Sequence, residues 1–202
     1  MFEWLCREPG GPRPADPLTP MEAYAQEFIR ASNRSRQLGI TLPPVQFLVR
    51  KDCLDMQRLG PMLQEYVGRF SQDEIVGQAF VINAQLMALL ADKLGLPLTL
   101  TMGWFDHAGR QPYRHDDAFI EKLVKEGAGR FLTEGLPLHV WLTSPACEVL
   151  DVTLPTTLAT VTGAKSLSGR VVYLSNQTPA SVITYHPTVV GEDFLVKIGA
   201  VI

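Results

Sequence analysis

The sequence predicts an α+β fold in which helices are followed by a mostly antiparallel sheet. Helical patterns dominate the first 126 residues, whereas short apolar segments separated by turn residues follow from Leu136 onward. Apolar residues make up 46% of the 202 residues and charged residues 19%, a balance that supports a packed core. We therefore expect a single α+β domain over residues 21–202, after an extended proline-rich arm over residues 1–20.

The helices are predicted from their capping residues and apolar periodicity. Thr19 is typical of an N-cap because Pro20 and Glu22 follow it, and Gly39 ends this first helix. In the second helix, Gly60-Pro61 predicts a kink or a restart. Gly95 closes the most apolar helix of the chain. The predicted helices run from Pro20 to Gly39 and over residues 55–70, 79–94 and 116–126.

The strands are predicted from short apolar runs bounded by glycine, proline and polar residues. Residues 71–77 are expected to form a polar connection, residues 106–113 a loop, and residues 156–163 a loop or a short helix. The predicted strands span residues 45–49, 98–104, 137–143, 147–153, 170–175, 181–186 and 193–199.

Charge and cysteine content exclude several classes of protein. Eighteen basic and 21 acidic residues give a net charge of −3, which disfavours a dedicated nucleic-acid binder. Three cysteines cannot form a full disulfide framework, which suits a reducing compartment. The most apolar stretch, residues 81–100, is interrupted by Asp92 and Lys93, so we expect no membrane partner. A cytoplasmic protein is the expectation, with a secreted effector that uses a signal-free route as the alternative.

A predicted β-hairpin carries the residues that suggest chemistry. Two apolar runs, 138–143 and 147–154, flank a short turn at Pro145. A hairpin centred on Pro145 pairs residues whose numbers add up to 290, which places His139 opposite Asp151 on one face. A carboxylate in that position can orient an imidazole that acts as a base.

The same segment resembles the His–Asp half of the transglutaminase-like superfamily of thiol enzymes, which is related in fold to papain-like proteases and arylamine N-acetyltransferases. The resemblance rests on His-Val-Trp-Leu from His139 and Val-Leu-Asp-Val-Thr from Val149, and on the helix that leads through Leu94-Gly-Leu-Pro97 into a strand. It covers residues 71–155 and implies a papain-like or transglutaminase-like core there. In such families a nucleophilic cysteine stands at the start of a buried helix.

This chain has no cysteine at the start of the matching helix. Ala79 takes the nucleophile position when Asn83 is aligned with the acetyltransferase-like Cys-x-x-x-Asn spacing, whereas a transglutaminase-like count selects Phe80. We favour Ala79, because alanine is the usual replacement for a removed nucleophile. The chain is then either an engineered Cys-to-Ala form or a natural pseudoenzyme, unless Ala79 is simply a small residue at a tight helix start.

Elementary chemistry supports a nucleophile at position 79. The unpaired N–H groups and the positive end of a helix dipole stabilise a thiolate and can form an oxyanion hole. Gln78 could donate its side-chain amide to the same oxyanion. Trp104 and Trp141 are candidate walls of the cleft, although both could equally be core residues.

Other candidate sites have simpler interpretations. We expect Cys53 and Cys147 to be buried inert thiols, and Cys6 lies in the arm. A polar loop contains possible ligands for a divalent ion, but solvation and a helix start explain them equally well. These possible ligands are His107, His115, Asp116 and Asp117.

The sequence therefore predicts a Cys-His-Asp acyl-transfer site with no metal or other cofactor. His139 is expected to be the base and then the acid, and Asp151 its orienting group. The expected partner is a peptide, a protein side-chain amide, or a small acyl or amine substrate. The alternative is a non-catalytic peptide- or protein-binding module on the same fold.

Overall fold

The computed structural model describes residues 18–42, 52–129, 131, 135–178 and 182–200. In this part of the chain seven α-helices surround one five-stranded sheet, which confirms the α+β class. The sheet has the order β4-β3-β2-β1-β5, and every neighbouring pair is antiparallel. The strands are β1 (Thr99–His107), β2 (His139–Thr143), β3 (Val149–Asp151), β4 (Val172–Leu174) and β5 (Ile183–Val190).

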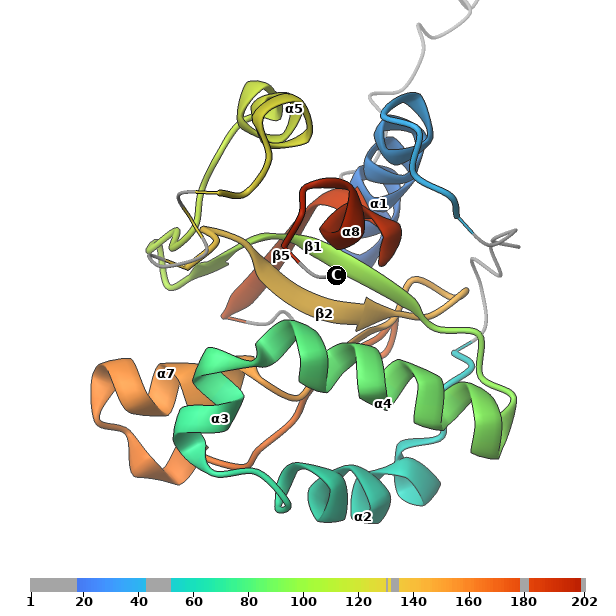
Figure 1. Ribbon diagram of the computed structural model, residues 1–202. Helices are drawn as coiled ribbons and strands as arrows, with labels where there is room; N and C mark the ends of the chain where they lie inside the picture. Colours follow the sequence, from blue (N-terminus) through green and yellow to red (C-terminus); the bar gives the residue numbers. More distant parts are fainter. Residues whose placement is uncertain (1–17, 43–51, 130, 132–134, 179–181, 201–202) are drawn as a thin grey trace, which may run out of the picture.

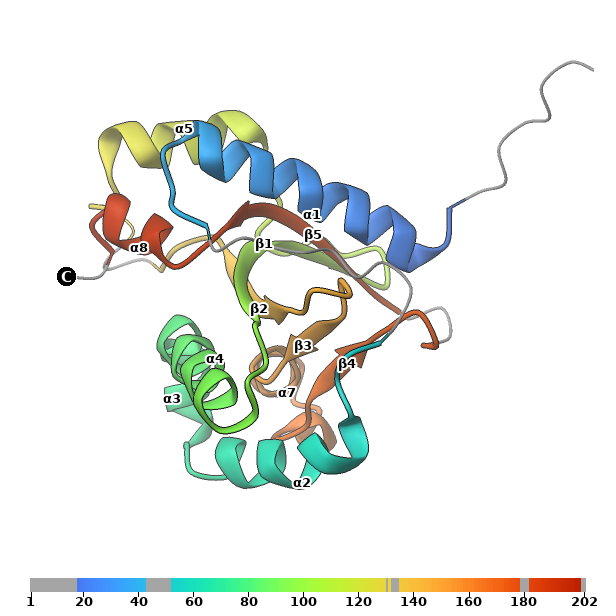
Figure 2. The same cartoon turned by 90° about the vertical axis from the view of Figure 1, so that its right-hand side faces the viewer.

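The helices cover both faces of this sheet (Figures 1 and 2). The helix α1 (Pro20–Gln37) lies on one face along β5, with α5 (Asp117–Glu126) beside it. The opposite face carries α2 (Met56–Val67), α3 (Gln72–Gly77), α4 (Ala79–Leu94) and α7 (Leu154–Thr162). A short helix, α8 (Asp193–Lys197), follows β5, and a 3-10 turn, Lys165–Leu167, follows α7.

Two apolar clusters hold these layers together. On one face, Ile82, Leu86 and Leu90 of α4 are buried against the sheet and α2. On the other face, Phe28 of α1 is buried in a cluster that includes Trp141. The sheet is therefore covered on both sides, which explains why all five residues of β2 are buried.

Local capping signals correctly located the ends of α1 and α4. Thr19 and Glu22 form the predicted capping box, and Gly39 adopts a φ of 72° just after α1. The predicted helix at 79–94 is confirmed at both ends, and Gly95 closes it with a φ of 62°. Residues 156–162 belong to the helix α7, which agrees with one of the two predicted alternatives, and Gly163 closes this helix with a φ of 74°.

Several element predictions were wrong. Residues 71–77 are not a plain connection, because Ser71 and Glu74 form a capping box that starts α3. The segment predicted as a strand at 193–199 instead contains the helix α8 (Asp193–Lys197), and the buried Phe194, Leu195 and Ile198 follow helical spacing. Of the two alternatives predicted at Gly60-Pro61, the restart was wrong, because α2 runs without interruption through Pro61. The strand predicted at 45–49 and most of the arm lie outside the described residues.

Candidate functional site

A cavity of about 570 Å³ opens where α3 meets α4 and where β2 begins. It brings together three predicted site residues, Gln78, Ala79 and His139. Apolar side chains, among them Phe80 and Leu138, form most of the remaining described wall. The start of the apolar helix α4 and the predicted base thus face the same space.

His139 and Asp151 form a hydrogen-bonded pair, with 2.5 Å between Nε2 of the imidazole and Oδ2 of the carboxylate. Both side chains are buried, with exposed fractions of 4% and 0%. Since Nε2 donates to the carboxylate, the neutral ring carries its lone pair on Nδ1. This arrangement leaves Nδ1 as the nitrogen that can accept a proton from a substrate or a nucleophile.

The predicted register of this hairpin was wrong, although the predicted face was correct. Leu142 pairs with Leu150 and Thr143 with Val149, so the numbers of each pair add up to 292 instead of 290. The turn is longer than predicted because Cys147 adopts a left-handed φ of 61°. A shift of two leaves every side chain on its original face, so Asp151 lies diagonally from His139 and still reaches it.

Asp151 is surrounded by donors that stabilise its charge. Its Oδ1 accepts hydrogen bonds from the backbone N–H groups of Thr153 and Leu154 and from the Thr153 hydroxyl. Its Oδ2 accepts from His139 and, at 2.9 Å, from the Tyr185 hydroxyl. Burial alone raises the pKa of the Asp151 carboxyl, but the His139 charge and these hydrogen bonds outweigh burial and lower it. Asp151 therefore stays ionised and can fix the imidazole.

A chain of side-chain hydrogen bonds links this pair to the first turn of α4. The Asn83 amide donates to the backbone carbonyl of Ala79 at 2.9 Å and to the Thr153 hydroxyl at 3.4 Å. The Thr153 hydroxyl in turn donates to Asp151. Asn83 is fully buried and does not line the cavity, so its position is structural support beneath Ala79 rather than a cleft wall.

Aromatic rings fix the plane of the His139 imidazole. The Phe105 ring meets it edge-on with 5.2 Å between centroids, and Trp141 stacks at 5.9 Å. Trp141 is fully buried and donates its indole N–H to the Tyr24 hydroxyl. The prediction that Trp141 is a cleft wall was wrong, because it packs behind His139 in the core. Tyr113, which lines the cavity, stacks on the outer side of the ring.

Trp104 was also wrongly predicted as a cleft residue. Its ring stacks on His186 with 3.8 Å between centroids, and the Arg114 guanidinium lies 5.6 Å above it. Its position one residue from Gly103, the partner of His139, turns it to the opposite face of the sheet. Trp104 does not line the cavity that holds His139.

The structure brings no existing cysteine into this cavity among its described residues. Burial raises the pKa of the Cys147 thiol to about 11, and burial together with Glu148 raises the pKa of Cys53. Cys53 donates its thiol hydrogen to the Glu148 carboxylate at 3.0 Å. Neither side chain offers a thiolate at neutral pH. Cys6 lies outside the described residues.

The possible metal ligands of the polar loop make protein contacts instead. His115 lies within hydrogen-bond distance of the Tyr113 carbonyl and the Thr188 hydroxyl. Asp116 caps α5, and Asp117 pairs with Arg34. The loop's His107 ends β1. In the described ranges, no three His, Cys, Asp or Glu side chains gather as a metal site would require.

Sequence reasoning missed Tyr185 and Thr153, which complete the surroundings of Asp151. Thr153 had a local signal, since a hydroxyl residue two positions after an aspartate can return a hydrogen bond to it. Tyr185 had none, because it reaches Asp151 from β5, 34 residues away in the sequence.

Comparison with protein-family models found no matching family, and neither curated proteins nor solved structures gave a match. In the described part of the chain, no helix combines the length and apolar character that a membrane span needs.

Proposed function

We propose that the cavity at the start of α4 is an acyl-transfer site of the transglutaminase-like type, in which Ala79 stands at the nucleophile position. One observation carries this proposal: the ionised, buried Asp151 orients His139 on the wall of the same cavity that Ala79 lines. A purely structural histidine needs neither a place on a cavity wall nor a helix start that lines the same cavity.

With cysteine at position 79, the site has the parts that two-step acyl transfer requires. The imidazole Nδ1 takes the thiol proton, and the thiolate attacks the carbonyl carbon of an amide. The imidazolium then gives that proton to the amine as the C–N bond breaks. The amine departs, and the acyl group remains on the sulfur as a thioester. Water or a second amine attacks the thioester, His139 accepts its proton, and the thiol departs. The free N–H groups at the start of α4 stabilise the oxyanion in both steps.

With alanine at position 79, this covalent route is closed, because a methyl group cannot attack a carbonyl. We therefore propose that the present chain binds a peptide, a side-chain amide or a small acyl compound in this cavity without cleaving it. This is the binding-module function on a papain-like core, and the raised pKa values of Cys53 and Cys147 favour it over a displaced nucleophile.

The decisive experiment is alkylation of an Ala79→Cys variant with iodoacetamide at pH 6. A thiol with a pKa near 8.5 is about 0.3% ionised at that pH, and one with a pKa near 6 is about half ionised. The lower nucleophilicity of the more acidic thiolate reduces that gain in rate to roughly a tenth, so we expect alkylation about tenfold faster than at an ordinary exposed thiol.

A matched control is Val81→Cys, which places a thiol in the same cavity two residues further along α4. We expect the advantage of Ala79→Cys over Val81→Cys to disappear when His139→Ala is added. Equal rates at the two positions, or an advantage that survives the loss of the imidazole, would contradict the acyl-transfer proposal.

A further inference from the structure

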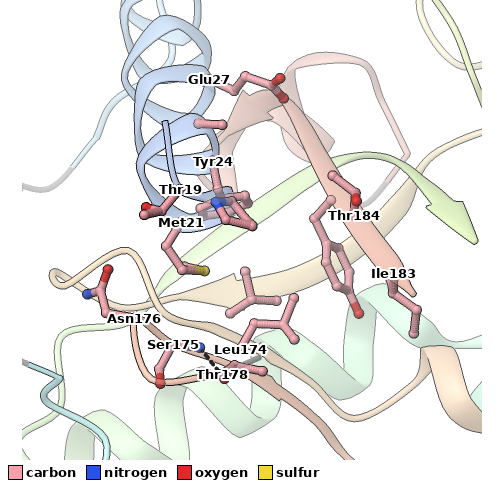
Figure 3. Close-up of a pocket in the computed structure, with 14 residues that line it drawn as sticks. Thr19, Met21, Tyr24, Glu27, Leu174, Ser175, Asn176, Thr178, Ile183 and Thr184 are labelled. Atoms are coloured by element: carbon pink, nitrogen blue, oxygen red, sulfur yellow. Dashed lines mark hydrogen bonds between the residues drawn. The ribbon is translucent and has the colours of Figure 1, made fainter. Parts of the chain in front are cut away.

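A second cavity, of about 440 Å³, lies on the face of the sheet that α1 covers (Figure 3). Its walls come from the first two turns of α1, from β3, from the end of β4 and from the start of β5. None of the described residues that line it also lines the cavity around His139. It is therefore a separate space, which the proposed acyl-transfer chemistry does not use.

The interior of this cavity is apolar. Met21, Val149 and the rings of Tyr24 and Tyr185 form part of its wall, and all four side chains are buried. Both phenol hydroxyls are already engaged elsewhere: Tyr24 with Thr143 and Trp141, and Tyr185 with the Asp151 carboxylate. The two tyrosines thus offer the cavity their rings, which favours an apolar or aromatic ligand body.

The polar groups at its ends differ in what they can offer a ligand. At one end, the hydroxyls of Ser175 and Thr178 accept hydrogen bonds from backbone N–H groups of their own turn. At the other end, Glu27 contributes a half-buried carboxylate, whose Oε2 lies 3.0 Å from His186 Nδ1. Figure 3 places Glu27 at the opposite end of the cavity from Ser175 and Thr178.

The side-chain charge that the described residues bring to this cavity is negative. Among its described lining residues, Glu27 is the single acidic side chain, and there is no lysine, arginine or histidine. Its Oε1 has no hydrogen-bond donor among the described residues that would compete with a ligand. A carboxylate next to an apolar pocket with two aromatic rings attracts a cation and repels an anion.

We propose that this cavity is a binding site for a small apolar molecule that carries a protonated amine. The amine lies against Glu27, and the apolar body fills the space between Met21, Tyr24 and Tyr185. The proposal is independent of the acyl-transfer site, because it needs neither a nucleophile at position 79 nor the imidazole of His139.

Three probes of equal chain length test the head group: hexylamine, hexanol and hexanoate at pH 8. The reporter is the indole N–H of Trp141 in ¹H–¹⁵N spectra, because it donates to the Tyr24 hydroxyl at 2.7 Å. The chain has three tryptophans, so Trp104→Phe and Trp141→Phe assign the signals. We expect saturable shifts of the Trp141 signal, with hexylamine bound at least about threefold more tightly than hexanol and hexanoate bound most weakly.

Two variants locate the binding. Glu27→Gln should reduce the preference for hexylamine over hexanol to about one, while hexanol binding stays unchanged. Ala23→Phe, which fills the cavity from α1, should abolish binding of both probes, whereas Val81→Phe in the cavity of His139 should leave it intact. Tighter binding of hexanoate, no saturable shift with any probe, or equal loss in Ala23→Phe and Val81→Phe would overturn the proposal.

Discussion

Removal of the Glu148 carboxylate should be among the most damaging single changes in this protein. Glu148 is fully buried and accepts five hydrogen bonds from three separate parts of the chain. The donors are the backbone N–H and thiol of Cys53, the backbone N–H of Leu54, and the hydroxyls of Ser144 and Tyr173. The side chain thereby ties the segment before α2 to the β2–β3 turn and to β4.

The cost follows from the donors that Glu148→Ala leaves without an acceptor. Two backbone N–H groups and the Tyr173 hydroxyl lose their partner, at about 1–3 kcal/mol each when water cannot replace it. Cys53 and Tyr173 are only partly buried, so water compensates some of this loss. We expect a decrease of about 3–5 kcal/mol in the free energy of unfolding. For a chain of this size, that corresponds to a drop in Tm of roughly 10 °C.

Urea unfolding followed by circular dichroism measures this decrease, with Glu65→Ala as the matched control. Glu65 of α2 forms an exposed ion pair with Arg69, which lies just after the end of this helix. Loss of the Glu65 carboxylate should therefore change the free energy of unfolding by less than about 0.5 kcal/mol. A decrease of less than about 1 kcal/mol for Glu148→Ala would refute the reasoning.

The same interaction predicts a pH dependence. Burial raises the pKa of Glu148, but the hydrogen bonds from Cys53, Ser144 and Tyr173 outweigh burial and lower it from its ordinary 4.5. Its ionised form therefore stabilises the fold above pH 4.5, and this stabilisation is lost as the pH falls through the lower pKa of the folded state. The difference in stability between the unaltered chain and Glu148→Gln should accordingly shrink below pH 4.5.

Further predictions concern single residues, each checked by urea unfolding. Gly103→Ala should lower the free energy of unfolding by at least about 2 kcal/mol, because the new Cβ would lie 2.1 Å from the backbone oxygen of His186. Gly60→Ala in α2 should instead raise it by about 0.5–1 kcal/mol, because a Cβ there meets no atom within 4 Å. Similar effects at the two glycines would contradict this steric argument. Tyr185→Phe should cost about 1–3 kcal/mol, since the buried Asp151 carboxylate loses a donor, and an unchanged stability would show that this hydrogen bond contributes nothing net.

The sequence alone determined the features that depend on a few neighbouring residues. Thr19 with Glu22 specified the start of α1, and Gly95 specified the end of α4, because caps and left-handed closures form within one turn. The alternation of side chains along a strand likewise determined that His139 and Asp151 share a face. The capping box that starts α3 was equally local, and the prediction missed a signal that the sequence contains.

The tertiary structure decided whatever depends on distant partners or on turn geometry. The left-handed backbone of Cys147 lengthened the hairpin turn and shifted its register by two, which no periodicity reveals. Trp141 became a core residue because Tyr24, 117 positions away, accepts its indole N–H. Tyr185 reaches Asp151 because the sheet holds β5 and β3 in one layer, with β1 and β2 between them. Contacts of this kind form only when separate elements pack against one another. The sequence therefore predicted the pair of His139 and Asp151, whereas the packing of the helices on the sheet decided which side chains surround that pair.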